Sequence, residues 1–396
     1  MPTLHLIAHN PTLRLIGLAM VLIGTVNASL FPYQSLIAIH YIGLTDSSYA
    51  LVLICASALA VMASVSAGII TDQRANRRQI ALLTAALTAI GPGLMLLAPS
   101  PAALILCHAV LLPLSASLYG QLLALTRLAC TDYPEQRDAI LATLRAGLSL
   151  TFVVVLTLWS FVFATGTDVM AIYWTATLAG AALFGLILRQ WPRDGQTLWP
   201  DAPSGLSLLQ SLREIAHRPV LIRLILLGAI SSGAALYMVL ISLVFASTPG
   251  RSTSDVALFV GIVAGCEVPF MLALPLIANR LPRTTLIALG AAFYAAYLAL
   301  MPLVAPYGAI WVLPVLAGIG GAAILTLPIT YLQDLMAHRP GTGSSLIALQ
   351  KVTADSFCAT AFALGTWAGG YTLAATFGAL IMLAGAATLL LADRIR

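Results

Sequence analysis

The sequence predicts an all-α membrane protein of about twelve transmembrane helices in two pseudo-symmetric six-helix halves. Hydrophobic residues make up 60% of the 396 positions and charged residues only 8%. Soluble domains are about one quarter charged, so this chain cannot build a water-exposed surface of ordinary size. Apolar runs of roughly 20 residues, the length that crosses a bilayer as a helix, follow one another along the whole chain. One long polar stretch near the middle divides these runs into two sets.

Turn-forming residues separate the apolar runs and set the limits of each expected helix. Ala98-Pro-Ser-Pro101 and Ser247-Thr-Pro-Gly250 are typical of these breaks, because proline and glycine interrupt helices. The expected spans are 14–38, 47–71, 79–98, 102–128, 138–164, 169–190, 219–246, 254–278, 284–303, 307–333, 344–367 and 371–392.

The polar stretch from Gln190 to Arg218 predicts the domain organisation. The predicted segments are an N-terminal six-helix bundle (1–190), a cytoplasmic linker (191–218) and a C-terminal six-helix bundle (219–396). A weak internal repeat supports two related halves, because Leu141-Ala-Thr-Leu-Arg145 resembles Ile347-Ala-Leu-Gln-Lys351 at the matching place in the second set. Duplicated halves around a central binding site are a recurrent plan among transporters.

The basic residues predict the orientation of the chain in the membrane. Most of them, 14 of 19, fall at alternate junctions, in the central stretch or at the C-terminus: Arg74, Arg77, Arg78, Arg127, Arg137, Arg189, Arg193, Arg213, Arg218, Arg280, Arg283, Arg339, Arg394 and Arg396. The opposite face has Arg251 and little else. By the positive-inside rule, both termini and the linker are expected in the cytoplasm. The net charge of +5 therefore sets topology and does not indicate nucleic-acid binding.

Glu267 is the charged residue expected nearest the bilayer midplane. It lies 12 residues from Asp255 and 12 from Asn279, or roughly 18 Å of helix from each end. Burial favours the protonated form of a carboxylic acid and hydration favours its release, which is the chemistry of proton coupling. A contact with substrate and a permanent ion pair with a neighbouring cation are the other interpretations of this residue.

Three further charges lie inside expected spans. Lys351 and Asp355 are four residues apart and share one helix face, so they either neutralise each other or form part of a substrate or proton site. Lys351 is the only lysine among 19 basic residues, and lysine changes protonation state on burial more readily than arginine. Arg145 lies eight residues beyond Arg137, about 12 Å into the membrane, which favours an inward, substrate-binding position.

Uncharged polar side chains complete the candidate substrate site. They are Asn27, Gln34, Gln121 and Tyr237. Amides and aromatic faces suit the hydroxyl groups and ring faces of a sugar, whereas a drug pocket would be more uniformly aromatic. Hydrogen bonding between helices is the alternative role for each of these residues.

A polar junction after the second span supplies a candidate cytoplasmic gate. Its acid, Asp72, ends one helix, and Arg77 and Arg78 open the next. This arrangement resembles the signature loop of the major facilitator superfamily, although Ala75-Asn76 stands where that loop has glycine. The resemblance implies that the carboxylate latches the cytoplasmic side by bridging to a basic group.

Four longer blocks resemble the bacterial sugar efflux transporters within that superfamily. They are Gln121–Arg127, Leu144–Leu150, Gly261–Pro269 and Gln333–Met336 with Arg339 and Gly341. The resemblance covers nearly the whole chain and implies proton-driven export of sugars or sugar-like compounds from a bacterial inner membrane. It carries over Glu267, Arg145, Gln121, Asp334 and Arg127 as family positions and adds Asp334, Arg127 and Arg339 to the gate. Lys351 and Asp355 have no counterpart and point to a different substrate.

The residues leave several transport modes open. Antiporters of this superfamily usually carry a Gly-Pro element in the fifth span, and the stretch Val153–Trp159 has neither residue. Export of drugs or zwitterionic metabolites, proton-driven import of a small solute, and a non-transporting receptor are the alternatives. No nucleotide-binding, hydrolase or zinc motif occurs, so we expect neither an enzyme nor a cofactor or metal. The expected partners are a small solute, protons and the lipid bilayer, with the protein acting as a monomer.

Overall fold

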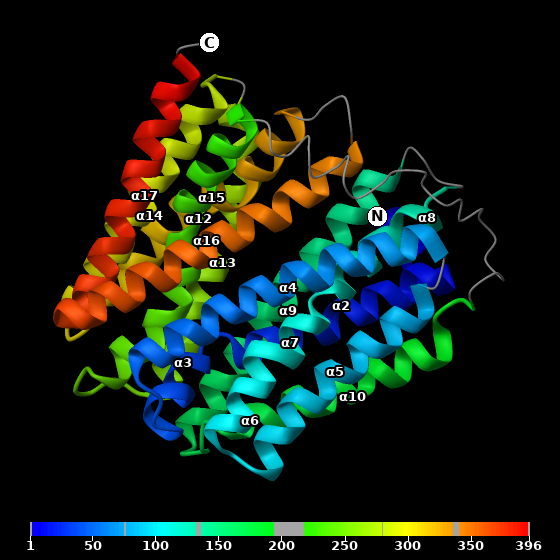
Figure 1. Ribbon diagram of the computed structural model, residues 1–396, viewed down its shortest axis with the longest axis horizontal. Coiled ribbons are helices and arrows are strands. Elements are labelled where there is room, and N and C mark those ends of the chain that lie inside the picture. Colours follow the sequence, from blue (N-terminus) through cyan, green and yellow to red (C-terminus); the bar gives the residue numbers. More distant parts are fainter. Residues whose placement is uncertain are drawn as a thin grey trace. The chain divides into compact units, whose positions relative to one another are not determined.

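The computed structural model of the chain is built of helices, with no strand among the residues that it describes (Figure 1). The described residues are 2–74, 77–131, 136–193, 218–278, 280–335 and 340–394. Within them, 11 helices are long and apolar enough to cross a membrane. The prediction of an all-helical, multi-pass membrane protein is confirmed.

The helices follow the expected apolar runs closely. In order they are α1 (Pro2–His9), α2 (Pro11–Leu30), α3 (Gln34–Leu36), π-helix η1 (Ile37–Tyr41), α4 (Asp46–Arg74), α5 (Arg77–Leu97), α6 (Pro101–Ile105), π-helix η2 (Leu106–Leu111), α7 (Leu112–Ser115), α8 (Ser117–Ala129), α9 (Arg137–Ala164), α10 (Ala171–Gln190), α12 (Arg218–Ala246), α13 (Thr253–Ala278), α14 (Arg283–Val304), 3-10 helix η4 (Gly308–Val312), α15 (Leu313–Leu335), α16 (Pro340–Gly369) and α17 (Tyr371–Arg394).

Two expected spans are interrupted rather than continuous. The run 14–38 becomes α2, a turn over 31–33 and then α3 with η1, because Pro32 has no N–H to continue the helix. The run 102–128 becomes α6, η2, α7 and α8, and Pro113 is the second residue of α7, just beyond the π-helical turns. Proline removes one hydrogen bond of the helical ladder, and neighbouring groups in a bundle can tolerate that loss.

The eleventh expected span, 344–367, lies within α16, which is a single helix of 30 residues and is not among the 11. A helix of that length rises about 45 Å, which exceeds the thickness of a bilayer core. The side chains of residues 341–348 lie outside the described part of the chain, as does most of the predicted linker, residues 194–217.

The chain packs into two compact units, and the first comprises residues 1–30, 58–158 and 167–206. In this unit α10 packs against both α2 and α5. The contact with α5 is close because Gly180 has no side chain: a Cβ there would lie 2.8 Å from the backbone of Ala89. Small residues that let backbones approach are the usual basis of helix packing in membranes.

The second unit comprises residues 31–57, 159–166 and 207–396. Helices α12, α16 and α17 pack against one another, and α15 packs against α13 and α14. Short polar contacts join the early segments to this helical group: the Ser35 hydroxyl donates to the carbonyl of Val239 at 2.6 Å, and the Ser254 hydroxyl donates to the carbonyl of Ser160 at 2.6 Å. The predicted halves, 1–190 and 219–396, were defined by an internal sequence repeat. These units are defined by packing contacts, which do not test a repeat, so the two halves stay a prediction.

Candidate functional site

Glu267 lies near the middle of α13, where α15 leaves room for its carboxylate. Gly321 of α15 faces it so closely that a Cβ on that glycine would lie 2.5 Å from the Glu267 Oε1. Gly318, one turn earlier, lets the backbone of Cys266 approach in the same way. The glycines of α15 therefore form a surface against which a long side chain of α13 can lie.

Three tyrosines from two other helices surround this region. Tyr237 comes from α12, and Tyr294 and Tyr297 come from α14; their side chains are at most 2% exposed. The ring of Tyr297 lies edge-on to both others, with centroids 5.3 Å from Tyr237 and 5.2 Å from Tyr294. All three interact electrostatically with Glu267. This set of Glu267, Tyr237, Tyr294 and Tyr297 is called the Glu267 cluster below.

The polar groups of the Glu267 cluster are incompletely paired. Glu267 has no hydrogen-bond or ion-pair partner among the described residues. The buried hydroxyls of Tyr237 and Tyr297 interact with each other, and neither has a well-formed hydrogen bond to another described group. Buried polar groups are almost always paired in native structures. Groups left unpaired in one state are therefore candidates for binding a proton, water or solute in another.

Aromatic rings continue from the Glu267 cluster to the loop after α12. Phe259 of α13 packs near Tyr237, Tyr297 and Trp311, with centroids 6.5, 6.4 and 6.0 Å apart. The guanidinium of Arg251 lies 5.7 Å from the Trp311 ring and donates to the carbonyls of Ala305 and Tyr307. Arg251, which is expected on the face opposite the cytoplasm, thus links the loop after α12 to the segment between α14 and α15.

Lys351 and Asp355 form a direct ion pair on α16. The Lys351 Nζ donates to the Asp355 Oδ2 at 2.9 Å, and the two side chains are 68% and 17% exposed. The Ser57 hydroxyl of α4 donates to the same oxygen at 2.7 Å. Sequence spacing predicted the pair, whereas Ser57 is 298 positions away and no local pattern marks it.

The amides and the arginine of the predicted site divide between the two units. Asn27, Gln121 and Arg145 belong to the first unit, on α2, α8 and α9, and Gln34 on α3 belongs to the second. Gln121 is 4% exposed, and its Oε1 has no hydrogen-bond partner in the described part of the chain. Arg145 is exposed, and Asn27 and Gln34 are partly buried.

The predicted gate residues lie at helix ends. Arg77 is the first residue of α5 and Arg78 the second. Arg78 donates from Nη2 to the carbonyl of Leu188 at 2.9 Å, in the last turn of α10. Arg127 lies exposed in the last turn of α8. Asp72 and Asp334 belong to α4 and α15, but their side chains lie outside the described part, and Arg339 lies outside it altogether.

A family model described as the Major Facilitator Superfamily matches residues 16–351, which is most of the chain. The chain belongs to this superfamily. It is a secondary transporter and not an enzyme, as the sequence predicted. A Deinococcus radiodurans protein provisionally named a sugar efflux transporter is 27% identical over 367 residues, which cover 89% of this chain and 90% of that protein.

Solved transporter structures share the fold of this superfamily member. A mutant of the nucleoside transporter NupG has a TM-score of 0.75 at 13% identity, covering 97% of this chain and all of that one. A mutant of the peptide transporter POT in complex with sulfate has a TM-score of 0.76 at 14% identity, covering 96% and 94%. At such identities the likeness concerns the fold alone.

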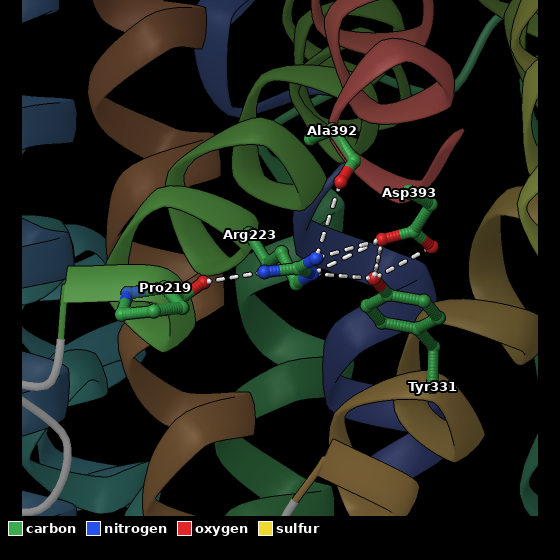
Figure 2. A network of polar contacts seen from close by, with 5 residues as sticks. All are labelled: Pro219, Arg223, Tyr331, Ala392 and Asp393. Atoms are coloured by element: carbon green, nitrogen blue, oxygen red, sulfur yellow. Dashed lines mark hydrogen bonds and ion pairs between the residues drawn. The ribbon is translucent and has the colours of Figure 1, made fainter. Parts of the chain in front are cut away.

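The transporter also contains a buried charge network that the sequence analysis missed. Figure 2 shows Arg223 of α12 between α15 and α17. Its Nη2 lies 3.0 Å from the Asp393 Oδ1, its Nε donates to the Tyr331 hydroxyl at 2.9 Å, and that hydroxyl lies 3.0 Å from both Asp393 oxygens. Arg223 is 6% exposed but only five residues from the start of α12, so from sequence it is indistinguishable from an arginine that reaches the interface.

Proposed function

We propose that this transporter exports sugars or sugar-like compounds in exchange for protons by alternating access, with Glu267 as the proton-carrying carboxylate. The observation that supports this most is a half-buried carboxylate in mid-helix without a cationic partner among the described residues. A fixed ion pair would have held the charge permanently. An unpaired carboxylate instead changes protonation state when water reaches it.

Hydroxyl-rich solutes suit the side chains assigned to the substrate site. Asn27, Gln34, Gln121 and Tyr237 offer amide and phenol groups, and the buried Gln121 Oε1 is free to accept a hydrogen bond in the described structure. Arg145 and Lys351 add cationic donors. A site built to pair a hydroxyl rejects solutes that lack it, because its own polar groups would then be left unpaired. The name of the Deinococcus radiodurans relative points to the same solute class.

A cytoplasmic gate of Asp72, Arg77, Arg78, Arg127, Asp334 and Arg339 completes the proposed cycle. Opposite charges at helix ends close the cytoplasmic side and separate when it opens. Removal of the acid in Asp72→Asn is expected to favour the inward-open state, so cysteines on the cytoplasmic side become more reactive to a membrane-impermeant maleimide. Unchanged labelling would argue against the latch. The chain is proposed to act as a monomer in a bacterial inner membrane with both termini in the cytoplasm.

A zwitterionic solute is the second candidate, and the ion pair of Lys351 and Asp355 favours it. A 68%-exposed lysine beside a carboxylate offers opposite charges at one place, and a zwitterion could bind by exchanging partners with this pair. Asp355 would then be the alternative proton carrier.

Purified protein in liposomes separates these proposals. Radiolabelled glucose, lactose and glycine betaine are each offered under an imposed pH gradient of either sign. Proton-coupled sugar exchange predicts sugar accumulation on the acidic side of the membrane and abolition of this accumulation by a protonophore. Accumulation of glycine betaine alone would favour the zwitterion, and accumulation of either solute on the alkaline side would reverse the direction to symport.

A further inference from the structure

We infer that Tyr237 and Tyr297 are positioning residues that hydrogen-bond the ionised carboxylate of Glu267 and so set the pH at which this residue releases its proton. The inference rests on the proposed function, because it concerns the residue through which protons are proposed to pass. It adds two side chains to that step, one of which comes from α14, where the sequence analysis placed no functional residue.

The packing of α15 places the tyrosines and the carboxylate together. Gly320 and Gly321 are adjacent: a Cβ on the first would lie 2.7 Å from the backbone N of Tyr294, and a Cβ on the second 2.5 Å from the Glu267 Oε1. Two neighbouring residues of α15 therefore contact α14 and α13: Gly320 faces the α14 backbone at Tyr294, and Gly321 faces Glu267. Tyr297 lies one turn after Tyr294 on α14. Tyr237 packs edge-on against Tyr297, with 5.3 Å between the ring centroids, and also interacts electrostatically with Glu267.

The hydroxyls of Tyr237 and Tyr297 are the available donors. Their residues are 1% and 0% exposed, and within the described structure each hydroxyl has only the other as an interaction partner, without a well-formed hydrogen bond. A poorly paired buried hydroxyl is costly, so a state of the transporter in which both form good hydrogen bonds is favoured. An ionised carboxylate accepts several hydrogen bonds, and charge-assisted bonds are the strong ones.

The groups around Glu267 contain no competing positive charge. The titratable residues that interact with it in the described part of the chain are Cys266 on its own helix, Tyr237 on α12, and Tyr294 and Tyr297 on α14. Where α15 contacts Glu267 it has glycines, which carry no titratable group. Within the described structure, the tyrosine hydroxyls are therefore the groups that can stabilise the ionised carboxylate.

The test is a pH titration of the protonated carboxyl band by infrared spectroscopy on purified, reconstituted protein, which needs no transported solute. The chain has 14 acidic residues, and the difference between wild type and Glu267→Gln isolates the band of Glu267. In Tyr297→Phe and in Tyr237→Phe the carboxylate loses a donor. In each variant the protonated carboxyl band is expected to disappear at a midpoint pH about one unit higher than in wild type. That shift corresponds to the loss of one hydrogen bond to a charged group.

Tyr49→Phe is the matched control, since Tyr49 is 1% exposed in the same unit and packs on Phe362. It should leave the titration unchanged. A Glu267 band that titrates but does not shift in either variant, or shifts equally in the control, would overturn the tyrosine assignment while leaving the proposed function intact. A wild-type protein without any titrating Glu267 band would overturn both. If one variant fails to fold, the other carries the test.

Discussion

At the scale of single residues, the adjacent glycines Gly320 and Gly321 of α15 have different structural roles. A Cβ at Gly320 would meet backbone atoms of Gly290 and Tyr294 at 2.7 Å, whereas one at Gly321 would meet the end of the Glu267 side chain. Backbone cannot move aside cheaply, but a flexible side chain can rotate. The first glycine therefore supports the packing of α14 on α15, and the second supports the position of the carboxylate.

The two alanine variants should behave differently. Gly321→Ala is expected to fold with a melting temperature within a few degrees of wild type but to lose at least about tenfold in proton-coupled transport, because Glu267 is displaced. Gly320→Ala is expected to melt several degrees lower, because overpacking costs about 1–3 kcal/mol. Thermal unfolding in detergent and proteoliposome transport measure the two effects. Equal loss of stability in both variants would contradict the assignment of separate roles.

The Lys351–Asp355 pair gives a second test at this scale. After exchange of the two residues, the position that accepts the Ser57 hydroxyl would carry a lysine, which cannot accept a hydrogen bond. The double variant Lys351→Asp with Asp355→Lys is therefore expected to lose transport, while Lys351→Arg retains it. Full transport in the exchanged variant would mean that the pair only neutralises charge.

From sequence alone, candidate site residues can be picked out where a residue is chemically out of place. Glu267, Lys351 and Asp355 stand out in apolar runs because a charge there is costly. Tyr294 and Tyr297 do not stand out, because aromatic residues are ordinary in membrane helices. Their three-residue spacing puts them on one face of α14, but only packing against α12 and α15 brings that face near a carboxylate.

At the scale of helices, the network around Arg223 joins α12, α15 and α17. Its guanidinium also donates to the carbonyl oxygens of Pro219 and Ala392, so it contacts the backbone of two of these helices (Figure 2). The side chains of Arg223 and Asp393 are 7% and 23% exposed. We interpret the network as a structural fastening of these helix ends.

Loss of one partner should therefore destabilise the protein without changing its coupling. Asp393→Asn leaves the buried Arg223 guanidinium without its counter-charge, and Arg223→Met leaves the Asp393 carboxylate without its cation. We expect a loss of about 2 kcal/mol, below the range for a fully buried pair because Asp393 is partly exposed. The matched control is Arg218→Met at the exposed first residue of α12. Thermal unfolding measures stability, and a change in the pH dependence of transport in Asp393→Asn would instead assign the network to the transport cycle.

Element boundaries followed the sequence except where proline fell inside an apolar run. The interruptions before α3 and α7 arise at Pro32 and Pro113, whereas α5, α14 and α15 continue through Pro92, Pro302 and Pro328. Whether a proline ends a membrane helix depends on whether neighbouring helices can pair the released carbonyl. That depends on tertiary packing, which periodicity does not contain.

At the scale of the whole molecule, the charge distribution predicts the orientation. Reporter fusions test it: a fluorescent protein fused after Arg396 or within 194–217 should fluoresce, and alkaline phosphatase inserted near Gly250 should be active. Phosphatase activity of a fusion at the C-terminus would show the opposite topology.

The substrate and the direction of transport are less predictable from sequence than the fold. They depend on small differences in affinity between states, whereas hydrophobicity and loop charge act over the whole chain.

Protons are proposed to pass through Glu267, and the sharpest test of this role is transport by Glu267→Gln in proteoliposomes. Two assays are run on the same preparation: solute accumulation driven by a pH gradient, and exchange of labelled for unlabelled solute without a gradient. A neutral amide cannot carry the proton but has nearly the same shape. If Glu267 carries the proton, gradient-driven accumulation is lost in this variant while exchange persists. Accumulation that keeps its full dependence on the pH gradient in this variant would contradict it.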